Sequence, residues 1–192
     1  MTRSNFLEDI NLWKRVVNEN SGDAFSALFR KYYKPLLNYG LQLVPRKQLV
    51  KDSIQELFFT VWDRRDRLSE IENVSSYLFT SFRRTLFRQV EMFQIWQKRD
   101  QLYFVETIQE IGLNTEQSLI VEEINRETKE NLKKAFENLT GHQKEAAFLK
   151  FYCGLSNDEI SDVMGIRKES VYNYMYRAIC VLKESMSISL AG

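Results

Sequence analysis

The fold of the C-terminal part is decided by the stretch Gly154-Leu155-Ser156-Asn157-Asp158-Glu159-Ile160-Ser161-Asp162-Val163-Met164-Gly165-Ile166. Gly154 is suited to end a preceding helix in the left-handed conformation. Ser156, with Glu159 three residues later, forms a capping box that predicts the start of a short helix. Gly165 then supplies a tight turn before a second helix. This order of signals predicts a helix-turn-helix.

The second helix of this motif is expected over about residues 168–183, with one apolar side and one polar side. The polar side and the helix start carry Lys168, Glu169, Tyr172, Asn173, Tyr176 and Arg177. A helix that enters the major groove needs one side anchored on its own domain and another facing base edges and phosphates. The alternative is an ordinary helix pair with a solvated outer face. The complete order of signals favours DNA binding.

The N-terminal half of the chain also has a helical period, from Phe6 to about Gln97. Breaks are expected at residues 21–23 and 44–46, and further helices at about 48–65 and 77–96. No run of alternating apolar residues rich in β-branched side chains occurs. The sequence therefore predicts an all-α protein with two small helical domains.

One face of the predicted helix 48–65 is polar and opposite to its apolar stripe. Asp52, Gln55, Glu56 and Phe59 share this face at spacings of three, four and seven residues. Acidic and hydrogen-bonding groups beside an exposed aromatic ring suit a basic helical partner. The alternative is a solvated helix face, which is common for exposed charges.

The next predicted helix interleaves aromatic residues with arginines. They are Tyr77, Phe79, Phe82, Arg83, Arg84, Phe87, Arg88, Phe93 and Trp96. Rings that stack on bases and cations that hold the backbone suit single-stranded nucleic acid. A helix packed in a bundle also needs a wide apolar stripe. We therefore expect about half of these rings to belong to the core.

Charge changes sign between the two halves. Between residues 100 and 131 there are eight acidic residues against two basic ones, whereas the preceding helix is basic. This predicts a linker at 98–129 between domains at 6–97 and 130–185. The whole chain carries 27 basic and 26 acidic residues, a net charge of +1. Affinity for nucleic acid must therefore come from local segregation of charge.

Composition argues against several classes of function. Cys153 and Cys180 are too few for a disulfide framework and too far apart for a metal knuckle. His142 is the single histidine, and no glycine loop suited to phosphate occurs. No segment has the length and hydropathy of a membrane span. We expect a cytoplasmic protein that is not an enzyme and needs no metal or cofactor.

Taken together, these pieces resemble the extracytoplasmic-function group of sigma-70-type RNA polymerase sigma factors. The resemblance is carried by Asp52-x-x-Gln55-Glu56-x-Phe58, by the basic aromatic helix and by the C-terminal helix-turn-helix. Asp23-Ala24-Phe25 also matches the opening motif of the family. Leu139-Thr140-Gly141-His142-Gln143 is similar to the signature that opens region four, with Thr140 in place of the usual proline.

This resemblance implies a role for each site. Docking on the β′ subunit of core polymerase, which also includes a β subunit, would use Asp52, Gln55, Glu56, Phe59 and Trp62. Capture and opening of the −10 element would use Tyr77, Phe79, Arg83, Arg84 and Arg88, although Arg84 and Arg88 stand where the family commonly has asparagine and aspartate. Reading of the −35 element would use Lys168, Glu169, Tyr172, Asn173, Tyr176 and Arg177.

The implied partners are core RNA polymerase, promoter DNA and an anti-sigma factor. The mechanism would be binding and strand opening, while the polymerase supplies the catalysis. One alternative is a stand-alone helix-turn-helix regulator that binds duplex DNA without polymerase. Another is a regulatory interaction protein that uses the acidic helix and barely contacts DNA.

Overall fold

The computed structural model describes residues 3–68, 71–100, 136 and 138–189 of the 192-residue chain. Its helices are α1 (Arg3–Glu19), α2 (Gly22–Leu43), α3 (Lys47–Asp63), the short 3-10 helix η1 (Arg65–Arg67), α4 (Val74–Asp100), α6 (Gly141–Ala147), the π-helical turn η2 (Phe148–Tyr152), α7 (Asn157–Met164) and α8 (Lys168–Ser189). No strand occurs within these residues. The predicted all-α class is confirmed.

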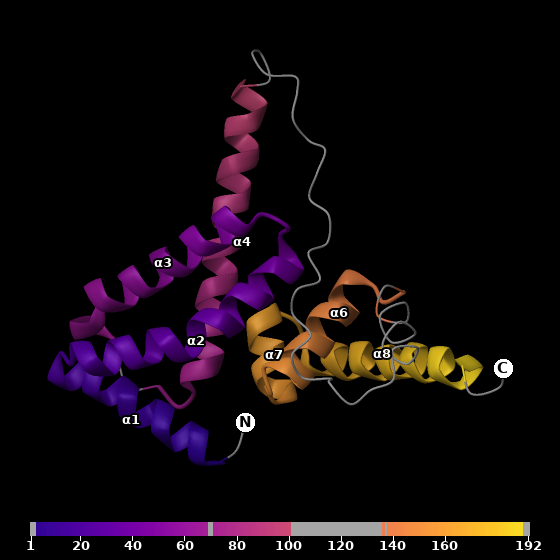
Figure 1. Cartoon of the computed structure of the whole chain (residues 1–192), viewed down its shortest axis with the longest axis horizontal. Coiled ribbons are helices and arrows are strands. Elements are labelled where there is room, and N and C mark those ends of the chain that lie inside the picture. Colours follow the sequence, from indigo (N-terminus) through magenta and orange to yellow (C-terminus); the bar gives the residue numbers. More distant parts are fainter. Residues whose placement is uncertain (1–2, 69–70, 101–135, 137, 190–192) are drawn as a thin grey trace.

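Helices α1 to α4 form the first bundle, in which α1 packs on α2, α2 on α3, and α3 on α4 (Figure 1). The break between α1 and α2 is capped by Ser21, whose hydroxyl accepts a hydrogen bond from the Ala24 amide at 3.3 Å. The largest fully buried side chains of this bundle are aromatic and include Trp13, Tyr32, Tyr39 and Phe82. Burial of these rings stabilises the bundle, because each removes a large apolar area from water.

Gly40 sets the distance at which α2 approaches its neighbours. A Cβ atom at this position would lie 2.5 Å from Val50 of α3 and 2.8 Å from Phe82 of α4. Both distances are shorter than a van der Waals contact. The absence of a side chain therefore allows three helices to meet closely around Gly40.

Helix α4 begins at Val74, three residues earlier than the predicted start at about Tyr77. The reason is a local cap, since the Asn73 side-chain oxygen accepts a hydrogen bond from the Ser76 amide at 2.9 Å. The cap places Val74 and Ser75 inside the first turn, and both are buried.

Helices α6 to α8 form the second bundle, and its helix-turn-helix is confirmed. Gly154 follows η2 with a φ of 71°, in the left-handed region. Ser156 accepts a hydrogen bond from the Glu159 amide at 3.2 Å, and Glu159 accepts one from the Ser156 amide, which completes the predicted capping box. Gly165 ends α7 with a φ of 65°, in the left-handed region. Glycine adopts this conformation without the steric clash that a Cβ atom would cause, so the chain can turn into α8.

The two bundles pack against each other mainly through α4 and α7 (Figure 1). Buried side chains of both bundles belong to one continuous apolar cluster, which runs from Trp13 to Met175. Helix α8 extends away from the first bundle. The predicted acidic linker at 98–129 lies almost entirely outside the described residues.

Candidate polymerase and DNA interfaces

Helix α3 presents the predicted docking residues on its outer side. Phe59 is 70% exposed and Gln55 is exposed as well, while Asp52, Glu56 and Trp62 are half-buried. The opposite side of the helix is anchored in the core by Val50, Ile54, Leu57, Phe58 and Val61. Phe59 therefore adds apolar area to an otherwise polar surface of the helix. We use the name docking face for Asp52, Gln55, Glu56, Phe59 and Trp62.

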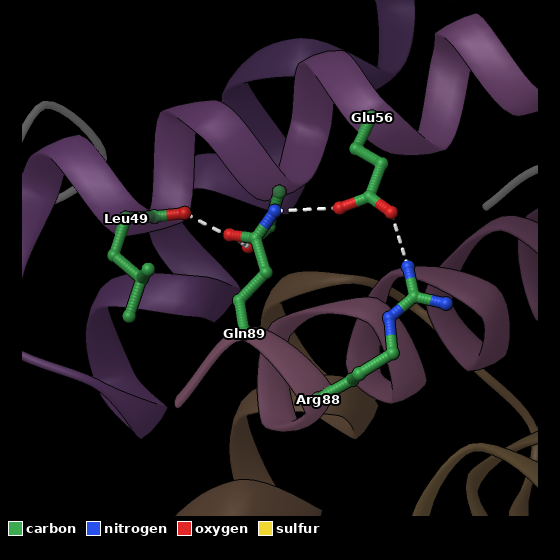
Figure 2. A network of polar contacts seen from close by, with 5 residues as sticks. Leu49, Glu56, Arg88 and Gln89 are labelled. Carbon is green, nitrogen blue, oxygen red and sulfur yellow. Dashed lines mark hydrogen bonds and ion pairs between the residues drawn. The ribbon is translucent and has the colours of Figure 1, made fainter. Parts of the chain in front are cut away.

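The carboxylate of Glu56 is held by two side chains of α4, shown in Figure 2. Gln89 Nε2 donates a hydrogen bond to Glu56 Oε2 at 2.6 Å, and the Arg88 guanidinium pairs with Glu56 Oε1. Gln89 Oε1 lies 2.7 Å from the hydroxyl of the buried Ser53. The structure therefore brings together a predicted docking residue and a predicted −10 residue, and it adds Gln89, which the sequence analysis missed.

The ring of Trp62, at the end of the docking face, is contacted by two side chains. Its indole packs against Phe25 with ring centroids 4.9 Å apart. The Arg65 guanidinium lies 4.4 Å from the ring centroid on a neighbouring turn, and also donates to the Trp62 carbonyl at 2.6 Å. These contacts hold the indole in one orientation at the surface.

The aromatic residues of α4 divide between core and surface, as expected. Phe79 is only 1% exposed, and its ring packs edge-on against Tyr39 at 5.5 Å. Phe79 is therefore part of the core in this arrangement, and its contact with −10 DNA stays a prediction. Phe82 is also buried, whereas Tyr77 is half-buried against Trp13 at 5.1 Å. Phe87 and Phe93 are exposed.

The three arginines predicted to contact −10 DNA lie in different environments. Arg84 is exposed, and Arg88 is exposed but paired with Glu56. Arg83 is half-buried, and its Nε donates to Glu145 Oε1 at 2.8 Å. Burial alone would lower the pKa of Arg83, but the hydrogen bond and charge of Glu145 raise it. Two of the three cations are thus already paired within the chain.

Glu145 itself lies on α6, in the second bundle, and is almost fully buried. It also accepts a hydrogen bond from the Tyr39 hydroxyl at 2.6 Å. Burial first, and then the charge of Glu145, raise the pKa of Tyr39 well above its usual value. We call Tyr39, Arg83 and Glu145 the interdomain polar cluster. The role of Glu145 has no local signature in the sequence, because its partners lie far away along the chain.

The outer side of α8 presents every predicted −35 residue to solvent. Tyr176 is 71% exposed and Tyr172 is 53% exposed, and Lys168, Glu169, Asn173 and Arg177 are exposed too. The inner side is buried through Val171, Met175 and Ala178. Lys168 pairs with Asp158 of α7 at 2.5 Å, which joins the start of α8 to the preceding helix. We use the name recognition face for the six exposed residues.

The single histidine and the two cysteines show no catalytic arrangement among the described residues. His142 is exposed and stacks on Tyr174 at 5.4 Å. Burial raises the pKa of Cys153 to about 12, so its thiol stays protonated near neutral pH. The described part of the chain contains no group of three or more side chains suited to a metal. It also contains no helix with the length and hydropathy to cross a bilayer.

A helix-turn-helix whose second helix has an exposed polar side is an arrangement found in many DNA-binding proteins. The family model for sigma-70 region 2 matches residues 28–91, and the model for sigma-70 region 4 matches residues 129–179. Together the two matches cover more than half of the chain. The chain belongs to the sigma-70 family, and it is a sigma factor that directs core RNA polymerase to promoter DNA. It is not itself an enzyme.

Two solved structures have the same fold. One is the sigma factor RpoE in complex with the anti-sigma factor NepR from Bartonella quintana, with a TM-score of 0.59 and 20% identity. That comparison covers 85% of this chain and 97% of the other. The second is CnrH in complex with the cytosolic domain of CnrY, with a TM-score of 0.60, 15% identity, and coverage of 94% and 98%. No curated protein sequence matches the chain significantly.

Proposed function

We propose that this sigma factor divides its work among three surfaces. The docking face binds the coiled coil of the polymerase β′ subunit, α4 captures the −10 strand, and the recognition face reads the −35 duplex. The observation that carries this proposal is the exposure of polar and aromatic side chains on α3 and α8, each opposite a fully buried stripe. Such two-sided helices leave one side free for a partner.

The docking role rests on the composition of the α3 surface. Asp52 and Glu56 supply negative charge, Gln55 supplies a donor and an acceptor, and Phe59 supplies apolar area. A basic amphipathic helix of a partner matches all three properties, because opposite charges steer the encounter and the ring is buried at the centre.

The −10 role is assigned to the exposed positions of α4. Arg84 is exposed and available to phosphates, Arg88 is exposed but paired with Glu56, and Tyr77 is half-buried. Arg83 joins them once it is released from Glu145. With Phe79 in the core, base stacking falls to the remaining rings.

The −35 role is assigned to α8. Asn173 has the amide that suits adenine in the major groove, while Lys168 and Arg177 suit phosphates. The two tyrosines add planar groups beside them. Residues 6–97 are thus the polymerase and −10 domain, 98–129 the linker and 130–185 the −35 domain.

We also propose that the protein acts in the cytoplasm and that an anti-sigma factor binds it there. One structural neighbour is in complex with the anti-sigma factor NepR, and the other is in complex with the cytosolic domain of CnrY. The similar fold of this chain makes a partner of the same kind the natural expectation.

Retention on immobilised core polymerase tests the docking role. The wild type should be retained, and the double variant Glu56→Lys with Gln55→Ala should be lost, because a cation replaces the anion that faces the partner. Glu72→Lys, at an exposed position outside α3, has the same charge change and should be retained. Equal retention of the wild type and the double variant contradicts the docking role. Run-off transcription with core polymerase then separates initiation from the alternative, a stand-alone regulator.

A further inference from the structure

Glu56 is oriented by a chain of hydrogen bonds that ends in the core. Ser53 is fully buried on α3, and its hydroxyl lies 2.8 Å from the Leu49 carbonyl and 2.7 Å from Gln89 Oε1. An ionised carboxylate only accepts hydrogen bonds, so the amide nitrogen of Gln89 faces Glu56 and its oxygen faces the Ser53 hydroxyl, which can donate to it. There it donates to Glu56 Oε2 at 2.6 Å, as Figure 2 shows.

This arrangement restricts a side chain that would otherwise rotate freely at the surface. A flexible carboxylate loses rotamer entropy when a partner immobilises it, and a carboxylate that is already held loses less. Gln89 supplies that restraint from the neighbouring helix, and it leaves the second oxygen of Glu56 for a charged partner. In the free protein Arg88 occupies this second oxygen.

We infer that Gln89 is a positioning residue for polymerase docking, which acts through Glu56 and is itself oriented by Ser53. This inference rests on the proposed role of Glu56 in the docking face. It assigns no polymerase contact to Gln89 itself.

A double-mutant cycle tests the inference by the affinity of the full chain for core polymerase. Gln89→Ala should weaken binding by about fivefold, within the range of the net contribution of one ordinary hydrogen bond. Glu56→Ala should weaken it further, and adding Gln89→Ala to Glu56→Ala should change nothing more. Ser53→Ala should reproduce part of the Gln89→Ala effect. Thermal unfolding of each variant identifies a loss of fold.

A failure of the Gln89 inference can be distinguished from a failure of the docking role. If Gln89→Ala weakens binding equally with and without Glu56, Gln89 does not act through Glu56 and the inference is overturned. The same conclusion follows if Gln89→Ala has no effect while Glu56→Ala does. If Glu56→Ala has no effect, the docking role itself fails.

A separate observation concerns the contact between the two bundles. Glu145 of α6 is buried, and both of its hydrogen-bond donors come from the first bundle, Tyr39 Oη at 2.6 Å and Arg83 Nε at 2.8 Å. The Asn38 amide also bonds to the Tyr152 hydroxyl, and the Asn73 amide bonds to Glu159. Polar contacts therefore join the bundles at three places.

A buried ion pair of this kind is stable only while both partners stay together. Removing Arg83 leaves the buried carboxylate of Glu145 without a compensating charge. Glu145 is therefore suited to hold the bundles in this arrangement, and it neutralises the arginine that the −10 strand would need. The Arg83 guanidinium is further fixed over the Phe87 ring, 4.7 Å from its centroid.

The geometry points to an autoinhibitory contact, in which Glu145 covers and neutralises Arg83 until the two bundles separate. This proposal rests on the proposed −10 role of Arg83. Recruitment to polymerase would then expose the −10 surface, because separation of the bundles removes α6 from α4.

Cys153 offers a native probe of this separation. It is 6% exposed and lines a small cavity between the bundles together with Pro35 and Phe79. The parent for this test is the Cys180→Ser variant, in which Cys153 is the remaining cysteine. Iodoacetamide should modify Cys153 about tenfold faster when Glu145→Gln is added. The reason is that loss of one charged hydrogen bond shifts the equilibrium between packed and separated bundles by about that factor. Tyr39→Phe, which keeps the buried ring, should act in the same direction. Glu91→Gln, at an exposed position of α4, is the matched control.

The second measurement is the affinity of the same variants for a single-stranded −10 oligonucleotide. Glu145→Gln should bind several-fold more tightly than the parent, and adding Arg83→Ala should remove this gain. If Glu145→Gln leaves the labelling rate of Cys153 unchanged, Glu145 does not hold the bundles together and the proposal is overturned. The autoinhibitory role is overturned if Glu145→Gln speeds the labelling of Cys153 but does not tighten oligonucleotide binding, while Arg83→Ala still weakens that binding. If Arg83→Ala has no effect in any background, the −10 role of Arg83 fails instead.

Discussion

The Tyr39 hydroxyl donates a hydrogen bond of 2.6 Å to Glu145 Oε1, although the two residues lie 106 positions apart in the chain. The same oxygen accepts the 2.8 Å hydrogen bond from Arg83. Region 2 and region 4 of this sigma factor therefore meet around one buried carboxylate. The stability of the closed arrangement and the availability of the −10 surface depend on the same group.

The raised pKa of Tyr39 predicts a loss of stability at alkaline pH. Because the folded protein keeps this proton above the ordinary value of 10.0, the stabilisation is complete below pH 10 and declines as the pH rises towards the folded pKa. At pH 8, Tyr39→Phe should lower the free energy of unfolding by about 1–2 kcal/mol. The difference from wild type should shrink above pH 10, as measured by urea unfolding at both pH values. Tyr176→Phe, at an exposed site, should follow the wild type; a constant difference for Tyr39→Phe would contradict the prediction.

Close packing around Gly40 predicts that even one methyl group destabilises the first bundle. Gly40→Ala should lower the free energy of unfolding by about 1–3 kcal/mol, because Val50 and Phe82 must move away from the new Cβ. Gly22→Ala is the matched control at the start of the same helix, where no atom lies within 4 Å. It should be neutral or slightly stabilising. Denaturant unfolding of both variants checks the pair, and equal stabilities would refute the packing argument.

The capping box at the start of α6 predicts a role for Thr140. Thr140 donates its amide to Gln143 Oε1 at 2.9 Å and accepts from the Gln143 amide at 3.5 Å. Thr140→Ala should therefore cost about 1 kcal/mol of stability, whereas Thr140→Ser should stay close to the wild type. Thermal unfolding measures both, and a Ser variant as unstable as the Ala variant would show that the hydroxyl is not responsible.

The recognition face predicts two distinguishable defects in promoter binding by the assembled holoenzyme. Asn173→Ala should cost about 1–3 kcal/mol on the preferred −35 duplex and relax base preference, because it removes contacts to a base edge. Arg177→Ala should weaken binding to all sequences and lower the salt dependence by about one charge, as expected for a phosphate contact. Titrations at several salt concentrations separate the two effects. Retention on core polymerase should be unchanged, and equal promoter occupancy by all three proteins would exclude α8 as the reader.

Several features of this sigma factor follow from short stretches of sequence. The caps at Ser21 and Ser156 and the left-handed turn at Gly165 depend only on residues within one or two turns. The capping box of Thr140 and Gln143 has the same kind of local signature and could have been predicted in the same way. Phe79 shows the limit, because its spacing fits a core ring and a surface ring equally well. Only packing against Tyr39 decides between them.

The amino-acid sequence by itself determined the helices, their caps, the helix-turn-helix and the polar faces of α3 and α8, because each depends on side chains within about seven positions. The tertiary structure alone decided that Arg83 pairs with Glu145, that Arg88 and Gln89 hold Glu56, and that the bundles share a core. Those contacts join residues more than 30 positions apart. Helical periodicity defines which way a side chain points from its own axis, and only the packing of whole helices defines what it meets there.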